Sequence, residues 1–166
     1  MVQSLMALLA LLATLFFVYN QQQNLIQVER ALIRSELAAQ ATSVAVDRLE
    51  EIGAMPFDRF TIGETRVAGR TGLTAASDFE YAVPPADVDD FHGARVVQER
   101  VLWGDTMRFQ VNTRVAYASE GDPGLEVTGL RTKFKKVTAT VYSLNQHPAD
   151  TIRIAQTFAC GSLCEW

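Results

Sequence analysis

The chain has 166 residues, a length that fits one compact domain with an appendage better than two full domains. Its formal net charge is −4, from 15 basic and 19 acidic residues, and its longest basic run is the pair Lys135-Lys136. Binding to nucleic acid requires a concentrated basic face, so this composition argues against a nucleic-acid partner.

The N-terminal segment is the most apolar part of the chain. It carries no charged residue from Leu5 to Tyr19, and a helix from Met1 to Tyr19 would be about 28 Å long, close to a hydrocarbon core of about 30 Å. The segment is therefore predicted to be able to span a membrane. A cleaved signal peptide is disfavoured, because nothing basic precedes Leu5 and the polar run Asn20–Asn24 follows. We expect that the chain has lost a short leader or keeps this apolar end for anchoring or assembly.

An amphipathic helical pattern continues from Leu25 to Ile52, with apolar residues at three- and four-residue spacing. No Gly or Pro occurs from Met1 to Ile52, and Gly53 followed by Pro56 is a typical stop signal, so one helix is predicted over about residues 2–52. The polar residues 20–24 are either helical or locally melted. The apolar stripe is expected to be core under a sheet, and the charged residues to form a solvated face or intersubunit ion pairs: Glu29, Arg30, Arg34, Glu36, Asp47 and Arg48.

From Met55 onward the pattern changes to turn residues and short alternating segments. An antiparallel meander of three to five strands is predicted, with turns at Gly104-Asp105 and His147–Asp150 and a loop over Glu120–Arg131. The candidate strands are Phe79–Val83, Arg95–Trp103, Met107–Ala118, Lys133–Leu144 and Thr151–Phe158. In the fourth strand, Val137, Ala139 and Val141 are expected to face inward. The fold class is α+β, a long helix packed by its C-terminal half against a small antiparallel sheet. Three parts follow: an apolar half-helix (1–24), an amphipathic half-helix (25–53) and a β-rich head (54–166).

Two cysteines, Cys160 and Cys164, lie close together near the C-terminus. An exported domain would be expected to oxidise such a pair, and Gly161 makes the small ring sterically plausible. Free thiols in a cytosolic protein remain the alternative, and a metal site is less favoured because two thiolates fall short of four ligands.

Other candidate groups point away from catalysis. Asp87, Asp89 and Asp90 form an acidic loop that is expected to be solubilising, with calcium binding as the less favoured alternative because the spacing of an EF-hand is absent. His92 and His147 fall in predicted loops without a nucleophile and base nearby. The sequence has no Walker-type phosphate-binding loop, so we expect neither an enzymatic site nor a cofactor.

Three stretches of the chain resemble the type IV pilin-like proteins, which include minor pilins and the pseudopilins of type II secretion. They are the apolar N-terminal helix, the helix exit Ala38–Asp58 with its Pro-Phe-Asp turn, and the pair Phe134–Ser143 and Asp150–Ala159. Together they cover about a third of the chain. Two features depart from the family: Leu5 stands where its subunits usually carry glutamate, and a short Cys160 to Cys164 ring replaces its long C-terminal disulfide loop.

The resemblance implies a structural subunit of an extracellular filament, located at the cell surface after a stage in the inner membrane. Its implied partners are further copies of the same chain and a pilus or type II secretion assembly machinery. The alternatives are a pseudopilin and a monomeric periplasmic domain anchored in the membrane. The residues expected to form the filament core are Met1, Val2, Leu5, Leu8, Leu9, Leu12, Leu15, Phe16 and Tyr19.

Overall fold

One long helix occupies the first third of the chain. The computed structural model describes residues 2–145 and 151–166, and in it α1 runs over Val2–Gly53. Residues 20–24 are helical, which settles the alternative that the sequence leaves open. The chain divides into two compact units, Met1–Ala39 and Gln40–Trp166, so α1 contributes its last fourteen residues to the second unit. The second unit is called the head below.

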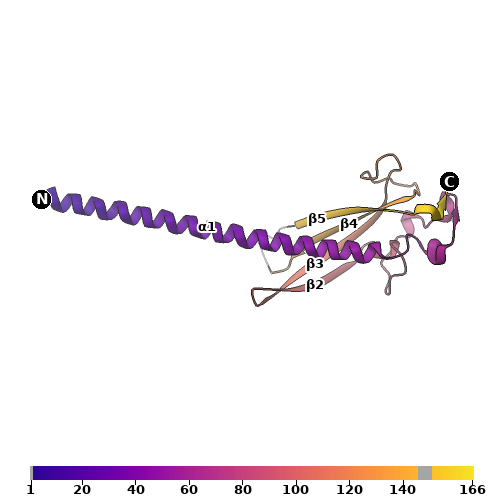
Figure 1. Cartoon of the computed structure of the whole chain (residues 1–166), viewed down its shortest axis with the longest axis horizontal. Coiled ribbons are helices and arrows are strands. Elements are labelled where there is room, and N and C mark those ends of the chain that lie inside the picture. The colour runs from indigo at the N-terminus through magenta and orange to yellow at the C-terminus, as the bar shows by residue number, and fades with distance from the viewer. Residues whose placement is uncertain (1, 146–150) are drawn as a thin grey trace. The chain divides into compact units, whose positions relative to one another are not determined.

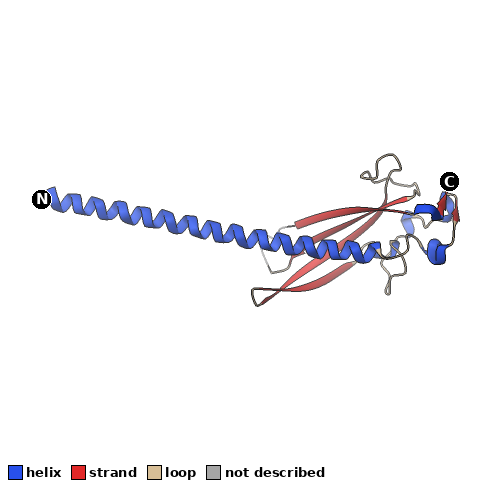
Figure 2. Ribbon diagram, in the orientation of Figure 1, coloured by secondary structure: helices blue, strands red, loops and turns tan. Residues whose placement is uncertain are grey.

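The head contains a four-stranded antiparallel sheet in the order β2-β3-β4-β5 (Figure 2). The strands β2, β3, β4 and β5 span Arg95–Leu102, Asp105–Tyr117, Phe134–Ser143 and Thr151–Ala159. This meander confirms the α+β prediction and four of the five predicted strands. The predicted strand at Phe79–Val83 is wrong, because the chain there forms no ladder with the described strands. The predicted turn at His147–Asp150 lies outside the described residues.

The β2–β3 hairpin follows from its two-residue turn. Trp103 and Gly104 both have positive φ, 52° and 90°, as a tight turn between right-twisted strands requires. The register pairs Leu102 with Asp105 directly across this turn. Gly104 suits the position because it has no Cβ to clash in that conformation.

The core of the head lies between the C-terminal part of α1 and one face of the sheet (Figure 1). From β4, Val137, Ala139 and Val141 are fully buried, as their alternation predicts. The matching stripe of α1 and the matching face of β3 supply the remaining central side chains: Ala41, Val44, Ala45, Leu49, Ile52, Phe109, Val111, Val115 and Tyr117.

Arg48 corrects the prediction that the charged helix residues form a solvated face. Only 5% of Arg48 is exposed, and its guanidinium lies 4.7 Å from the ring centre of Phe91. Its Nη1 donates to Glu51 Oε2 at 2.6 Å. The planar guanidinium can stack on an aromatic ring while its edge binds a carboxylate, which explains how an arginine fits within this interface. Asp47 is exposed, as predicted, and pairs with Arg100.

Short elements complete the head. β1 (Val67–Ala68) and β6 (Cys164–Glu165) pair in parallel, and Cys160 and Cys164 form a disulfide, as predicted. Within residues 2–145 and 151–166, five 3₁₀ helices connect the rest: η1 Arg59–Glu64, η2 Arg70–Gly72, η3 Ala76–Asp78, η4 Asp89–Phe91 and η5 Gly161–Leu163.

Candidate assembly surface and buried charge cluster

The predicted assembly residues expose their side chains in the single chain. The six whose side chains the structure describes are 53–68% exposed: Leu8, Leu9, Leu12, Leu15, Phe16 and Tyr19. The side chains of Met1, Val2 and Leu5 lie outside the described part. Side chains of this size strongly favour burial, so their exposure in the single chain is unusual for a folded protein.

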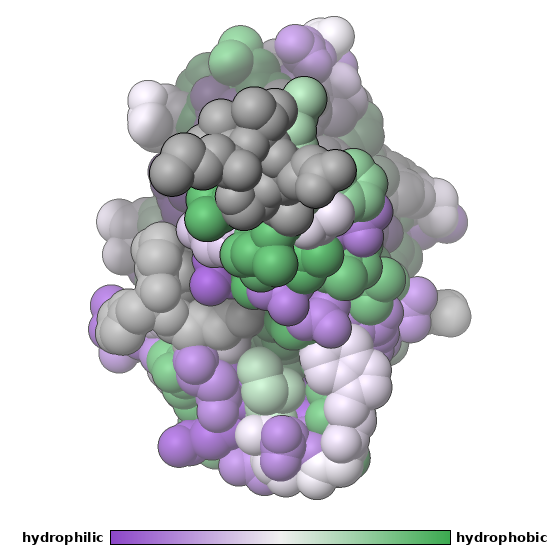
Figure 3. Space-filling view, turned by 90° about the vertical axis from the view of Figure 1, so that its left-hand side faces the viewer, coloured by the Kyte–Doolittle hydropathy of each residue, from purple (hydrophilic) through white to green (hydrophobic). Residues whose placement is uncertain are grey.

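The exposed apolar surface surrounds the helix rather than forming one stripe. Met6, Leu11, Phe17 and Val18 are also 51–64% exposed, although the list of predicted assembly residues omits them. Successive helical residues are rotated by about 100°, so an apolar run of this length, with Thr14 as its one hydroxyl-bearing aliphatic residue, covers every face. Figure 3 looks toward the N-terminal side of the molecule and shows green, apolar side chains in open view. Residues 8–19 are called the apolar segment below.

Within the residues that the structure describes, no helix has the length and hydropathy needed to cross a membrane. The predicted span begins at Met1, and its first side chains belong to the part that is not described.

The amphipathic stripe is buried over a shorter range than predicted. Leu25, Ile26, Val28, Leu32 and Ile33 are 40–65% exposed, so the prediction that the stripe is core from Leu25 onward is wrong for this section. The apolar face of the sheet is instead filled by α1 residues from Ala41 to Ile52.

A cluster of charged side chains lies inside the head. Lys135 Nζ donates to Asp89 Oδ2 at 2.7 Å, to Asp58 Oδ2 at 3.0 Å and to the Phe57 carbonyl at 2.7 Å. The side chains of Lys135 and of both aspartates are 0% exposed. Charges this deeply buried are rare and costly unless they are paired. These three residues are called the Lys135 cluster below.

Aromatic rings surround the lysine. Lys135 Nζ lies 4.3, 5.4 and 5.5 Å from the ring centres of Phe57, Phe79 and Tyr117. Asp58 is held separately, because Thr74 donates to it from its amide at 2.9 Å and from its hydroxyl at 3.0 Å. The Lys135 side chain therefore lies among aromatic rings, and hydrogen bonds hold the neighbouring Asp58 carboxylate in place.

The two aspartates differ in protonation. Burial raises the pKa of Asp89 to about 7, although the Lys135 charge opposes this shift. Burial also acts on Asp58, but the Lys135 charge and hydrogen bonds from the Thr74 and Phe60 amides outweigh it, so the pKa of Asp58 is below its ordinary value. At neutral pH, Asp58 is ionised and Asp89 is poised between its two forms.

The acidic residues 87–90 do not form the solubilising loop that the sequence predicts. Asp87 and Asp89 are 1% and 0% exposed, and Asp90 accepts from the Ala86 amide at 2.7 Å. Oxygens of Asp58, Asp87 and Asp89 lie within 4.8 Å of one another, a spacing that suits a cation. Lys135 contacts two of these three carboxylates and supplies a positive charge from the chain itself.

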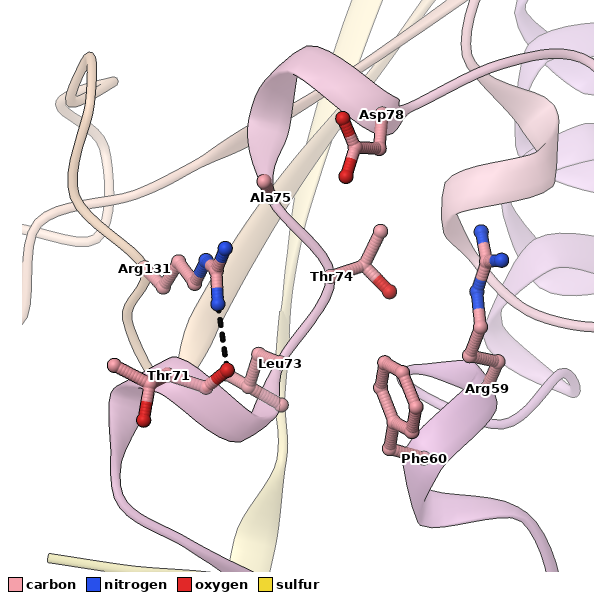
Figure 4. A pocket seen from close by; sticks show the side chains of 8 residues that line it. All are labelled: Arg59, Phe60, Thr71, Leu73, Thr74, Ala75, Asp78 and Arg131. Atoms are coloured by element: carbon pink, nitrogen blue, oxygen red, sulfur yellow. Dashed lines mark hydrogen bonds between the residues drawn. The ribbon is translucent and has the colours of Figure 1, made fainter.

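A cleft of about 240 Å³ opens elsewhere on the head (Figure 4). Its lining includes Arg59 and Arg131 on opposite sides, and Arg131 Nη1 donates to the Thr71 carbonyl at 2.6 Å. Its lining combines these two cationic side chains with the Asp78 carboxylate and with the hydroxyls of Thr71 and Thr74. His92 contacts the Val115 backbone through Nδ1, and His147 lies outside the described residues.

Comparison of the chain with family models, with curated proteins and with solved structures finds no match. The features of this chain therefore come from its own structure, which has an α+β head and a helical segment with exposed apolar side chains.

Proposed function

We propose that this chain is a structural subunit of an extracellular filament of the type IV pilin-like kind, which assembles through the apolar segment of α1. The observation that carries the proposal is the exposure of large apolar side chains on all faces of residues 8–19. A segment with one apolar stripe can be covered by one neighbour, but a segment that is apolar all round requires apolar surroundings on every side. A bundle of equivalent helices provides them.

The available free energy is large enough for polymerisation. At about 25 cal/mol per Å², burial of about 1,000 Å² of apolar surface favours assembly by about 25 kcal/mol before association costs. Subunits that contact one another head to tail without closing a ring form a helical fibre. The same segment would suit an apolar membrane interior before assembly, because both surroundings exclude water.

The exposed residues 25–33 extend the proposed interface. They alternate with charged side chains at Glu29, Arg30 and Arg34, so this section is apolar on part of its circumference only. We assign it to the outer part of the bundle, where charged groups can reach water or pair with neighbouring subunits.

The test is electron microscopy of the full chain after shearing from cells without detergent. The proposal expects the protein in the sheared fraction, with repeating fibres whose subunit mass corresponds to this chain. A monomeric membrane-anchored domain would instead stay with the cells and require detergent for release. Recovery of a monodisperse monomer in buffer would overturn both.

A secretion pseudopilin is the alternative form of this proposal, and fibre length distinguishes it from a pilus subunit. A pilus subunit would be recovered as long surface fibres from cells at ordinary expression, whereas a pseudopilin of a secretion apparatus would not. Measuring fibre length at native expression separates these two forms of the proposal.

A further inference from the structure

We propose that Lys135 and Asp89 form an intramolecular amide bond, and that Asp58 accepts the proton that the lysine must lose. The inference depends on the head alone and is independent of the proposed filament. It assigns a covalent role to a cluster that assembly does not use.

The reacting groups are held in contact. Lys135 Nζ lies 2.7 Å from Asp89 Oδ2, and the two residues are 46 positions apart in sequence. Lys135 is on β4 and Asp89 begins η4, so the fold brings them together and fixes both ends. Groups held at such distances react with effective concentrations of about 10⁵ M or more when their orientation is right.

The third group is placed to move the proton. Asp58 Oδ2 lies 3.0 Å from Lys135 Nζ, and two bonds from Thr74 fix the Asp58 carboxylate. The pKa of Asp58 is lowered, so Asp58 is ionised and holds the lysine proton only transiently before passing it on, and the raised pKa of Asp89 favours the neutral carboxylic acid that an amine can attack. The two carboxylates thus occupy different roles because their surroundings differ.

The reaction balances without an added reagent. Asp58 takes one proton from the Lys135 ammonium, and the amine nitrogen then forms a bond to Asp89 Cγ. The Asp89 C–OH bond breaks, and the hydroxyl leaves with the second ammonium proton as water. The first proton passes from Asp58 to solvent, and the remaining N–H of the amide can still donate to Asp58. Nothing is oxidised or reduced.

The surroundings favour the product. Asp89 Oδ1 is buried without a hydrogen-bond partner among the described residues, which is costly for a charged carboxylate. An amide carries no net charge and is easier to accommodate among the rings of Phe57, Phe79 and Tyr117 than an ion pair is. Complete burial also keeps bulk water from hydrolysing the bond.

The test is the intact mass of the purified full chain under denaturing, reducing conditions. The amide predicts a mass lower than that of the sequence by one water molecule. Tryptic digestion should yield one branched peptide joining the Lys135 and Asp89 segments, because trypsin does not cleave after an acylated lysine. A full sequence mass in protein that has stayed folded at neutral pH for days would overturn the proposal.

Variants locate the bond. Lys135→Arg keeps a positive charge but cannot form this amide, so it should show the full mass and no branched peptide. Lys136→Arg changes the neighbouring, partly exposed lysine and should keep the water loss. A mass lowered by one water in Lys135→Arg would place the modification elsewhere and refute the assignment, whatever the effect of either variant on stability.

Discussion

The two units of this chain place polar and apolar side chains in opposite ways. The helical unit exposes leucine and phenylalanine over residues 8–19, whereas the head buries Lys135 between two aspartates. Exposed apolar side chains are unfavourable when nothing covers them, and buried charges are unfavourable when no opposite charge pairs with them. The comparison teaches that the buried charges have partners within the chain, whereas the proposed function assigns the exposed residues partners from other molecules.

The largest expected effect is on assembly. Leu12→Glu places a carboxylate in the middle of the apolar segment, and burial of an unpaired charge in a helical bundle is too costly to be tolerated. We expect fibres to disappear, measured by electron microscopy of sheared protein. Val101→Glu is the matched control, because Val101 is 75% exposed on the head and should leave assembly intact. Fibres formed by the Leu12→Glu chain would contradict the assignment of the apolar segment.

The next largest effect concerns the stability of the head when Lys135 is replaced. Lys135→Met fills similar space but removes the group that Asp58 binds as a cation and that Asp89 binds as a cation or through the proposed amide. Both aspartates then stay buried without their partner, which should cost about 3–5 kcal/mol of head stability. Guanidinium unfolding of the full chain in mild detergent, followed by near-ultraviolet circular dichroism, measures this loss. Lys136→Met should cost less than about 1 kcal/mol, because Lys136 pairs at the surface. Equal losses of stability in the two variants would show that the burial of Lys135 does not determine the size of the loss.

Much of the fold could be predicted from the sequence. The long helix, its end at Gly53 and strands β2 to β5 follow from periodicity and turn residues, which are local signals. Lys135 has the same strand parity as Val137, Ala139 and Val141, so alternation alone places it inward. Its partners could not be predicted, because the pattern contains no information about a distant carboxylate that could pair with it.

Other differences between the predictions and the structure also arise from contacts between residues that are far apart in the sequence. Asp87 and Asp89 follow Pro84-Pro85 in a polar stretch that is typical of a surface loop, yet long-range contacts bury both. Arg48 is buried because Phe91, far along the chain, lies under its guanidinium. Phe79 fits a strand pattern but packs as a single ring against Tyr117, with centroids 5.3 Å apart. Each outcome depends on a partner that is remote in sequence.

A smaller effect concerns pH. In Lys135→Arg, which cannot form the amide but keeps a cation, burial should still raise the pKa of Asp89 above its unfolded value of 3.8. The folded state then binds more protons than the unfolded state, so stability should fall as pH rises from about 4 to about 7. The amide does not titrate, so wild-type protein should lack the part of this fall that Asp89 contributes. Unfolding curves across this pH range measure the difference.

The control for the pH effect is Asp89→Asn in the Lys135→Arg background. It removes Asp89 as a titrating group and should make the fall in stability between pH 4 and 7 smaller. The remaining fall is expected from Asp87, because burial and the Asp90 charge raise its pKa. A fall of unchanged size would show that Asp89 does not contribute to it.

The smallest expected effect is that of the disulfide. Cys160 and Cys164 enclose a short loop, and a chain-entropy estimate for such a loop is about 2 kcal/mol. Replacing both cysteines by serine should lower head stability by about this amount and leave fibre formation unchanged, because the bond lies in the head and the apolar segment in α1. Intact fibres with a destabilised head would confirm that the two units have separate tasks: one supplies cohesion between molecules and the other maintains its own fold.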